Sequence, residues 1–294
     1  MNPECLYHYT SVDTLELILR NKTIRFNPLT KMDDPLEQWS AHGRQEGAHI
    51  FISSWTNESA EIPDMWKQYC RPGPENGVRL KLPVNPFSLK KNKLPNGMAD
   101  SARMAIQLMD HFVHWSTGKH TTGDLFEDQK LFKEAIDAHP ECRSKLSEMM
   151  NSFSHTTVEC YPKDLNDLLH EVVYTNNVKE LFPRIYGNYQ GMDFETYDGF
   201  GRIKDTSWSW QHEWRYILHF FITTRGVKHA DGSVDLYPLP FDYYDLELDD
   251  EKLMQLEVTL SPVISKRCKK KVYELIERYC PTATVQESSL TKLS

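Results

Sequence analysis

Apolar and polar residues alternate from Trp208 to Phe221, and this predicts a β-strand because successive side chains of a strand point to opposite faces. The apolar residues of this strand share one face and form a core surface: Trp214, Tyr216, Leu218 and Phe220. The polar residues share the other face: Gln211, Glu213 and Arg215. A carboxylate between an amide and a guanidinium is a candidate site. The structural alternative is an ion pair between Glu213 and Arg215 on a solvated strand face, where such pairs contribute little.

The first part of the chain alternates short strands with short helices. Strands are predicted at Leu6–Tyr9, Thr23–Phe26, His49–Trp55 and Gly77–Leu82. An apolar stripe at helical spacing predicts the first helix, with residues Val12, Leu15, Ile18 and Leu19. Thr10 with Asp13 resembles a capping box for this helix, and Asn21–Lys22 ends it. Asp34 before Pro35 predicts a second helix start, and Pro63–Tyr69 predicts a short third helix.

The middle of the chain has helical spacing, and the tail returns to the mixed pattern. Residues 98–151 are predicted to form a helical insertion, interrupted at Gly123 and Pro140. Further strands are predicted near Thr156–Tyr161, Val172–Tyr174, Met254–Leu260 and Thr284–Val285. Ser265 opens a last helix with an apolar face, which Pro281 stops. The pattern predicts one α+β domain over residues 1–294 with the helical insertion inside it.

The composition is typical of a globular protein that is reduced and cytoplasmic. Hydrophobic residues make up 39% of the 294 residues and aromatic residues 12%, so extensive packing is expected. The net charge of −8 argues against a broad nucleic-acid footprint. The 6 cysteines are scattered without a CxxC pair, and no signal-peptide core or apolar run of about 18–20 residues is present. We therefore expect no disulfide framework and no membrane association.

Several ordered motifs together resemble the bacterial domain-of-unknown-function family 2971. They are Leu6-Tyr7-His8-Tyr9-Thr10-Ser11, Ile24-Arg25-Phe26, Asp33-Asp34-Pro35-Leu36-Glu37, Ser53-Ser54, Met65-Trp66 with Tyr69, Gly77-Val78, Lys204, Trp208 and Glu213-Trp214-Arg215. The resemblance covers nearly the whole chain apart from the region of residues 98–151. This chain departs from the family at Gln211, where the family often has Glu.

A second resemblance is to the ADP-ribosyltransferase fold, in the form whose members use His, Tyr and Glu. His8 matches the histidine and Glu213 the glutamate, while the tyrosine is Tyr69 or Tyr9. Gln211-His212-Glu213 also resembles the Gln-x-Glu signature of some transferases. The resemblance implies a split mixed or antiparallel sheet, with NAD as a substrate. His8, Tyr9, Thr10, Arg25, Ser53 and Tyr69 would form the NAD-binding group, with Glu213, Gln211 and Arg215 as the catalytic group.

The implied chemistry is physically consistent with these residue types. Breaking the nicotinamide–ribose bond develops positive charge on the ribose, as in glycoside hydrolysis, and an ionised Glu213 would stabilise it. Arg215 favours the ionised form, and Gln211 would orient an acceptor. His8 would bind ribose hydroxyls and Arg25 the pyrophosphate, with an aromatic ring on nicotinamide.

Each of these residues also has a structural alternative. His8 and Tyr69 would be core residues, and Ser53 with Ser54 would line a strand edge. Arg25 would pair with a nearby acid among Asp33, Asp34 and Glu37.

Three functions are compatible with these residues. The first is an NAD-consuming ADP-ribosyltransferase-like enzyme, in a toxin or phage-defence setting, with an unknown protein, nucleic-acid or small-molecule acceptor and a neutralising or activating protein partner. The second is a non-catalytic ligand- or partner-binding module that uses the same cleft. The third is a metal-dependent hydrolase or nuclease built on His111, His114 and His120. No carboxylate-rich metal signature accompanies these histidines, so we expect no metal. The sequence contains no Walker loop and no GxGxxG motif.

Overall fold

The computed structural model describes residues 3–146, 158–184, 186–189, 192–195, 199–222, 226–228, 234–236 and 238–293. The chain divides into two compact units. The first unit contains Met1–Lys93, Tyr161–His219 and Pro240–Ser294, and the second contains Leu94–Cys160 and Phe220–Leu239. The fold combines helices with a sheet that is mostly antiparallel and partly parallel, which confirms the predicted α+β class.

The main sheet of the first unit has the strand order β14-β2-β3-β1-β4-β15-β16. Its strands are β1 (Cys5–Ser11), β2 (Thr23–Pro28), β3 (Ile50–Thr56), β4 (Gly77–Pro83), β14 (Tyr244–Glu247), β15 (Glu257–Leu260) and β16 (Thr284–Gln286). The pair of β15 with β16 is parallel, and the other neighbours along this order are antiparallel. Strand β11 (Glu213–Ile222) joins the sheet through β3, and β6 (Leu169–Glu171) pairs with β11.

Strand β3 has two different partners along one of its edges, and this arrangement opens the sheet. Strand β11 pairs with β3 from Thr56 to Ile50. On the remaining edge, β2 pairs at Phe51 and Ile52, whereas β1 pairs only at Thr56. Strand β1 instead runs along β4 from Cys5 to Ser11. The sheet therefore splits beside the segment 53–54, between the ends of β1 and β2.

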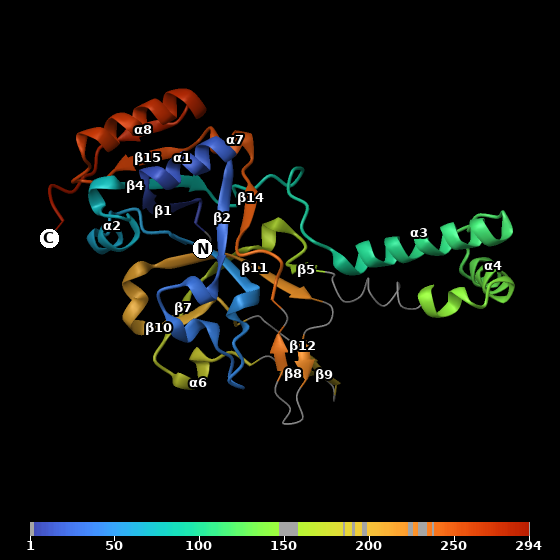
Figure 1. Cartoon of the computed structure of the whole chain (residues 1–294). Helices are drawn as coiled ribbons and strands as arrows, with labels where there is room; N and C mark the ends of the chain where they lie inside the picture. Colours follow the sequence, from blue (N-terminus) through green and yellow to red (C-terminus); the bar gives the residue numbers. More distant parts are fainter. Residues whose placement is uncertain are drawn as a thin grey trace. The chain divides into compact units, whose positions relative to one another are not determined.

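Two amphipathic helices lie side by side in the first unit, α1 (Val12–Asn21) and α8 (Lys266–Tyr279) (Figure 1). The predicted stripe of α1 is buried: Val12, Leu15, Ile18 and Leu19. Ser11, not Thr10, caps this helix, because the Ser11 hydroxyl accepts the backbone N–H of Thr14. Ser265 caps α8 as predicted.

Short elements complete the first unit. Helix α2 (Pro63–Tyr69) has the predicted bounds, and its Trp66 meets Tyr9 edge-to-face with ring centroids 4.9 Å apart. The remaining helices and strands are α6 (Val178–Leu181), α7 (Asp250–Leu253), β7 (Val173–Thr175), β8 (Tyr186–Tyr189), β9 (Met192–Glu195) and β10 (Ile203–Asp205). Strands β7 and β10 form a parallel pair, and β8 and β9 form an antiparallel pair.

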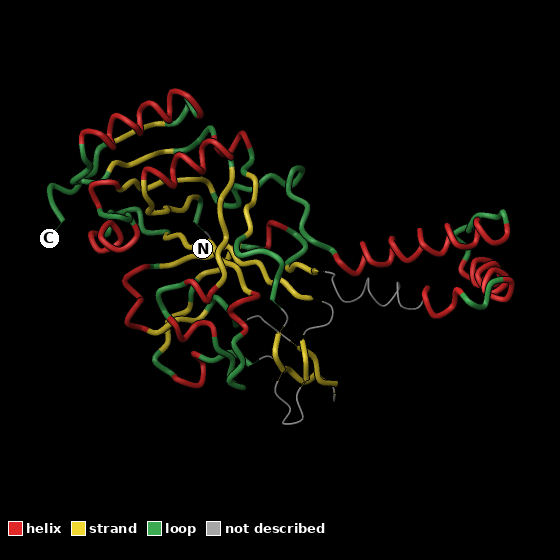
Figure 2. Tube along the Cα trace, viewed as in Figure 1, coloured by secondary structure: helices red, strands yellow, loops and turns green. Residues whose placement is uncertain are grey.

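The second unit contains two of the longer helices of the chain, drawn in red like the other helices in Figure 2. Its elements include α3 (Gly97–Thr117), α4 (Leu125–Ala138), β12 (Gly226–Lys228) and β13 (Val234–Leu236), and β5 (Val158–Tyr161) begins in it. Helices α3 and α4 enclose a small core of Phe112, Val113, Ala135, Ile136 and Leu146. The predicted insertion at residues 98–151 falls in this unit, and its residues 147–151 lie outside the described residues, as do residues 156 and 157 of the strand predicted near Tyr161.

Two predicted strands are shorter than their sequence pattern indicates. Residues 206–211 form a 3₁₀ helix, because the Asp205 carboxylate caps the backbone at Ser207, and β11 begins only at Glu213. The tail strand begins at Glu257 because Asp249 caps the short helix α7 just before it. Within the described parts of the chain, no helix combines the length and the apolar character needed to cross a membrane.

Candidate functional site

A backbone turn at His212 brings Gln211 and Glu213 into one cluster. His212 has φ 46° and ψ 50°, the left-handed conformation that a residue with a side chain rarely adopts. Its N–H donates to the carbonyl of Ser209 at 3.2 Å, and its own carbonyl accepts the Thr56 hydroxyl at 3.1 Å. The end of the 3₁₀ helix and the start of β11 are thus fixed to each other.

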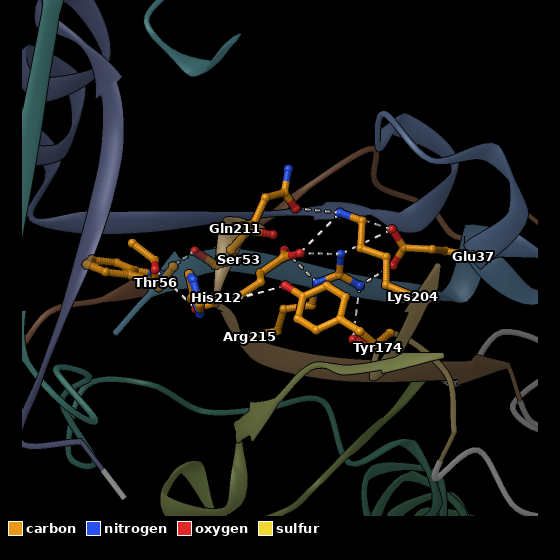
Figure 3. A network of polar contacts seen from close by, with 12 residues as sticks. Glu37, Ser53, Thr56, Tyr174, Lys204, Gln211, His212 and Arg215 are labelled. Carbon is orange, nitrogen blue, oxygen red and sulfur yellow. Dashed lines mark hydrogen bonds and ion pairs between the residues drawn. The ribbon is translucent and has the colours of Figure 1, made fainter. Parts of the chain in front are cut away.

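Four charged side chains form what we call the buried ion cluster: Glu37, Lys204, Glu213 and Arg215 (Figure 3). Each of these residues is at most 5% exposed. Arg215 Nε donates to Glu213 Oε1 at 2.7 Å, and Nη2 donates to Glu213 Oε2 at 3.1 Å. Nη1 and Nη2 of Arg215 also bind the Glu37 carboxylate, and Nη1 donates to the carbonyl of Gly201. Two carboxylates face two cations, so the cluster is neutral and its desolvation is compensated.

The ion cluster holds Glu213 in its ionised form. Burial raises the pKa of Glu213, but the charges of Arg215 and Lys204 outweigh it and lower the pKa to about 2. Burial lowers the pKa of Arg215, and the carboxylates of Glu213 and Glu37 raise it further than burial lowers it. The ion pair of Glu213 with Arg215 in the structural alternative is confirmed. Its solvated strand face is wrong, because this side of β11 is buried against η2 (Pro35–Gln38) and β10.

Gln211 links the ion cluster to helix α2. Lys204 Nζ donates to Gln211 Oε1 at 2.9 Å and to Glu213 Oε2 at 3.1 Å (Figure 3). Gln211 Nε2 donates to the hydroxyl of Tyr69 at 2.5 Å. Lys204 also lies 4.6 Å from the ring centroid of Trp208, in a cation–π contact. The Gln211 carboxamide is therefore bound on both sides within the protein.

Two cavities meet at the split in the sheet. The large cavity has a volume of about 610 Å³, and the small cavity has a volume of about 60 Å³. All six residues expected to bind NAD line the large cavity: His8, Tyr9, Thr10, Arg25, Ser53 and Tyr69. Four residues line both cavities: His8, Tyr9, Ser54 and Tyr69. Gln211 and Glu213 line only the small cavity, and Arg215 lines neither.

His8 lies at the point where β1 leaves β3. Its Nδ1 is 2.8 Å from the carbonyl of Ser54, an oxygen that can only accept, so Nδ1 carries the proton. Burial lowers the pKa of His8, and the bond to Ser54 opposes this only in part. The neutral ring therefore has Nε2 as a hydrogen-bond acceptor. The His8 ring also packs on Trp55, with ring centroids 5.0 Å apart.

The expected partners of Arg25 are wrong. Arg25 makes a bidentate pair with Asp245, with both N···O distances at 2.9 Å, and stacks 3.5 Å from the ring centroid of Tyr243. Asp245 faces Arg25 because β14 pairs with β2 in that register. Asp34 instead caps the backbone N–H of Leu36.

A second arginine of the large cavity is differently placed. Arg71 lines this cavity and, within the described residues, has neither an ion pair nor a hydrogen bond from its side chain. Arg25 is neutralised by Asp245, so Arg71 is the lining arginine with an uncompensated charge.

The sequence did not identify the roles of Glu37, Lys204, Tyr174 and Arg71. Glu37 and Lys204 belong to the quoted motifs. Glu37 lies 178 positions before its partner Arg215, whereas Lys204 lies only 9 positions before Glu213. Tyr174 accepts the backbone N–H of Glu213 at 2.9 Å through its hydroxyl. Burial raises the pKa of Tyr174, so its hydroxyl stays protonated. Counting the charged residues of the quoted motifs would have pointed to Glu37 and Lys204 as the acid and the base that accompany Glu213 and Arg215. No sequence signal marks Tyr174 or Arg71.

The histidines proposed as metal ligands lie on and after α3 in the second unit. The His114 and His120 rings stack with centroids 4.0 Å apart, and His120 Nδ1 is 3.0 Å from the Asp110 carboxylate. Over the described ranges, no group of three or more His, Cys, Asp or Glu side chains is arranged to hold a metal ion.

No family model, no curated protein and no solved structure matches this chain. The resemblances to family 2971 and to the ADP-ribosyltransferase fold therefore stay predictions.

Proposed function

We propose that the chain binds NAD in the split of the sheet and acts as an ADP-ribosyltransferase-like enzyme. The observation that carries this proposal is that His8 and Glu213 line the same small cavity, which shares four residues with the large one. The large cavity, at about 610 Å³, lies within the range typical of small-molecule sites. The split of β1 and β2 along β3 agrees with the split sheet that the resemblance implies.

Each residue of the proposed site has a defined task. In the reaction the nicotinamide C–N bond breaks, and nicotinamide leaves with the bonding electron pair while positive charge develops on the ribose. Glu213 is an ionised carboxylate beside the cavity and stabilises this charge. His8 Nε2 accepts a hydrogen bond from a ribose hydroxyl, and the ring of Tyr69 provides an aromatic surface for nicotinamide. ADP-ribose then passes to an acceptor nucleophile.

A second candidate is a non-catalytic module that binds its ligand in the same cavities. This candidate is favoured because both carboxylate oxygens of Glu213 already accept hydrogen bonds within the protein. Arg215 donates to both oxygens, and Lys204 donates to one of them. A ribose hydroxyl must then add to these bonds or displace one. The two candidates agree on the ligand site and differ on turnover.

The test follows nicotinamide release from NAD and measures NAD binding by calorimetry, with and without cell extract as a source of acceptor. Glu213→Gln is compared with Glu37→Gln, which removes the same charge from the same ion cluster but does not line either cavity. We expect release by wild type and a loss of about 10²–10³ in rate for Glu213→Gln relative to folded Glu37→Gln. Binding without release in every condition supports the non-catalytic module. A wild type that neither binds NAD nor releases nicotinamide overturns the proposal.

A further inference from the structure

The direction of the hydrogen bonds around Gln211 is fixed by chemistry. An ammonium group has only donors, so the atom of Gln211 that faces Lys204 must be its carbonyl oxygen. The Gln211 amide nitrogen then faces Tyr69 and donates to its hydroxyl at 2.5 Å. The two alternative orientations of the carboxamide are thereby reduced to one.

This direction determines what the Tyr69 hydroxyl can do. The oxygen accepts from Gln211, so the single O–H of Tyr69 points to another acceptor. Within the described part of the chain, the Tyr69 hydroxyl has no second hydrogen-bond partner. Burial raises the pKa of Tyr69, and the nearby charge of Glu213 adds to this, so the proton stays on the oxygen. Tyr69 lines both cavities, where a bound ligand would supply the acceptor.

The charge balance explains why a neutral amide occupies position 211. Glu37 and Glu213 already balance Lys204 and Arg215, and Gln211 is 1% exposed. A glutamate at this position would place a third carboxylate in the buried ion cluster. Its carboxylate would also accept a hydrogen bond from the Tyr69 hydroxyl and turn that O–H away from the cavities. Gln and Glu at this position therefore give opposite hydrogen-bond directions.

We propose that Lys204 and Gln211 are positioning residues that aim the Tyr69 hydroxyl, as a hydrogen-bond donor, at an oxygen acceptor of the ligand. Gln211 acts through Tyr69 and does not contact the acceptor nucleophile. This inference deepens the proposed NAD site and rests on it for the identity of the ligand. The accepting oxygen belongs to the nicotinamide carboxamide or to the ADP-ribose part, and separate probes distinguish these two sources.

The first measurement needs no ligand. The side-chain amide protons of glutamine are observed by NMR in wild type and in Tyr69→Phe. We expect one Gln211 amide proton to move upfield in the variant, because it loses its acceptor, while those of Gln255 stay in place. Gln255 is a suitable reference because its amide donates to the carbonyl of Glu251, away from both cavities. An unchanged Gln211 signal overturns the proposed hydrogen-bond relay, by which we mean the chain from Lys204 through Gln211 to the Tyr69 hydroxyl.

The second measurement titrates NAD, nicotinamide and ADP-ribose into Tyr69→Phe, Gln211→Glu and the double variant, with Gln255→Glu as the control of equal charge. Losing one hydrogen bond weakens binding about five- to tenfold, so we expect this loss in Tyr69→Phe for NAD and for the probe that carries the accepting oxygen. Gln211→Glu shows the same loss in folded protein, and no further loss occurs in the double variant. If Gln211→Glu does not fold, Gln211→Met replaces it, with a partial loss that again disappears in the Tyr69→Phe background.

The outcomes separate this inference from the proposed function. Unchanged binding in Tyr69→Phe, or losses that add in the double variant, overturn the relay even when nicotinamide release is intact. Binding that follows the expected pattern without nicotinamide release supports the relay and contradicts the enzyme. A wild type that binds none of the three probes overturns both.

Discussion

Both terminal guanidinium nitrogens of Arg215 donate hydrogen bonds to the carboxylate of Glu37, which lies 178 positions earlier in the chain. The same guanidinium holds Glu213 through Nε and Nη2. Arginine suits this position because its planar donors match two carboxylates at once. One side chain thus connects the turn after β2 to the candidate acid on β11.

Removing one carboxylate from the buried ion cluster is expected to destabilise the protein strongly. Glu37→Gln leaves one buried positive charge uncompensated and should lower the free energy of unfolding by about 3–5 kcal/mol. Glu274→Gln removes an exposed partner of Lys270 on α8 and should change it by less than about 0.5 kcal/mol. Urea denaturation of both variants checks this, and equal small effects would show that the cluster does not hold the fold.

Acid should weaken the fold through Glu213. Its pKa is about 2 in the folded protein against 4.5 for the free group, so the folded state binds fewer protons than the unfolded state in this range. The stabilisation is therefore complete above about pH 4.5 and is lost as the pH falls toward 2. Urea denaturation of wild type and Glu213→Gln from pH 6 to pH 3 gives the free energy of unfolding of each protein. The difference between the two free energies should become smaller as the pH falls. A difference of constant size contradicts the depressed pKa.

His8 should titrate below its ordinary pKa of 6.5, because burial disfavours the charged ring. The neutral form then predominates at pH 7, as the proposed acceptor role of Nε2 requires. The unfolded state takes up a proton on His8 first, so stability from this residue is present above pH 6.5 and declines below it. An NMR titration of the His8 ring protons measures the midpoint, with the urea-unfolded chain as the reference. A folded midpoint above the unfolded one would reject the assignment.

Arg71 should matter more than Arg25 for a ligand that carries a diphosphate. A charge-assisted hydrogen bond contributes about 1.5–3 kcal/mol, so Arg71→Gln should weaken NAD and ADP binding about tenfold to a hundredfold. Arg25→Gln should have a small effect, because Asp245 already occupies both guanidinium donors that face it. Calorimetry with NAD, ADP and adenosine checks this, since adenosine has no diphosphate and should bind Arg71→Gln as it binds wild type. Equal losses of ADP binding in the two variants would contradict the distinction.

Local signals predicted the elements well where short-range physics decides them. The stripe of α1 is buried as its spacing predicts, α2 has the predicted bounds, and Ser265 caps α8. These features depend on residues within a few positions of one another, where helical spacing and capping act. The strand predicted from Trp208 is present only from Glu213 onward. Its alternating pattern was overridden by an Asp205 cap and a left-handed His212 that the pattern does not encode.

The candidate site was predicted only in part. The alternation of side chains along a strand was enough to group three residues: Gln211, Glu213 and Arg215. The structure connects them, because Lys204 binds both Gln211 and Glu213, and Arg215 binds Glu213 directly. The period of two also pointed to the pair of Glu213 with Arg215, but it could not find Asp245 as the partner of Arg25 or Glu37 as the second partner of Arg215. Asp245 reaches Arg25 through the register of β14 with β2, over a separation of 220 residues.

The sequence by itself determined the α+β class, most helices and strands, and the residue types available for chemistry. The tertiary structure alone decided that Glu213 is buried and ionised, that β1 and β2 part along β3, and that His8 and Glu213 border one cavity. The reason is physical. Helix spacing and caps act over a few residues, whereas strand register and buried charge balance depend on groups that meet only when distant segments pack together.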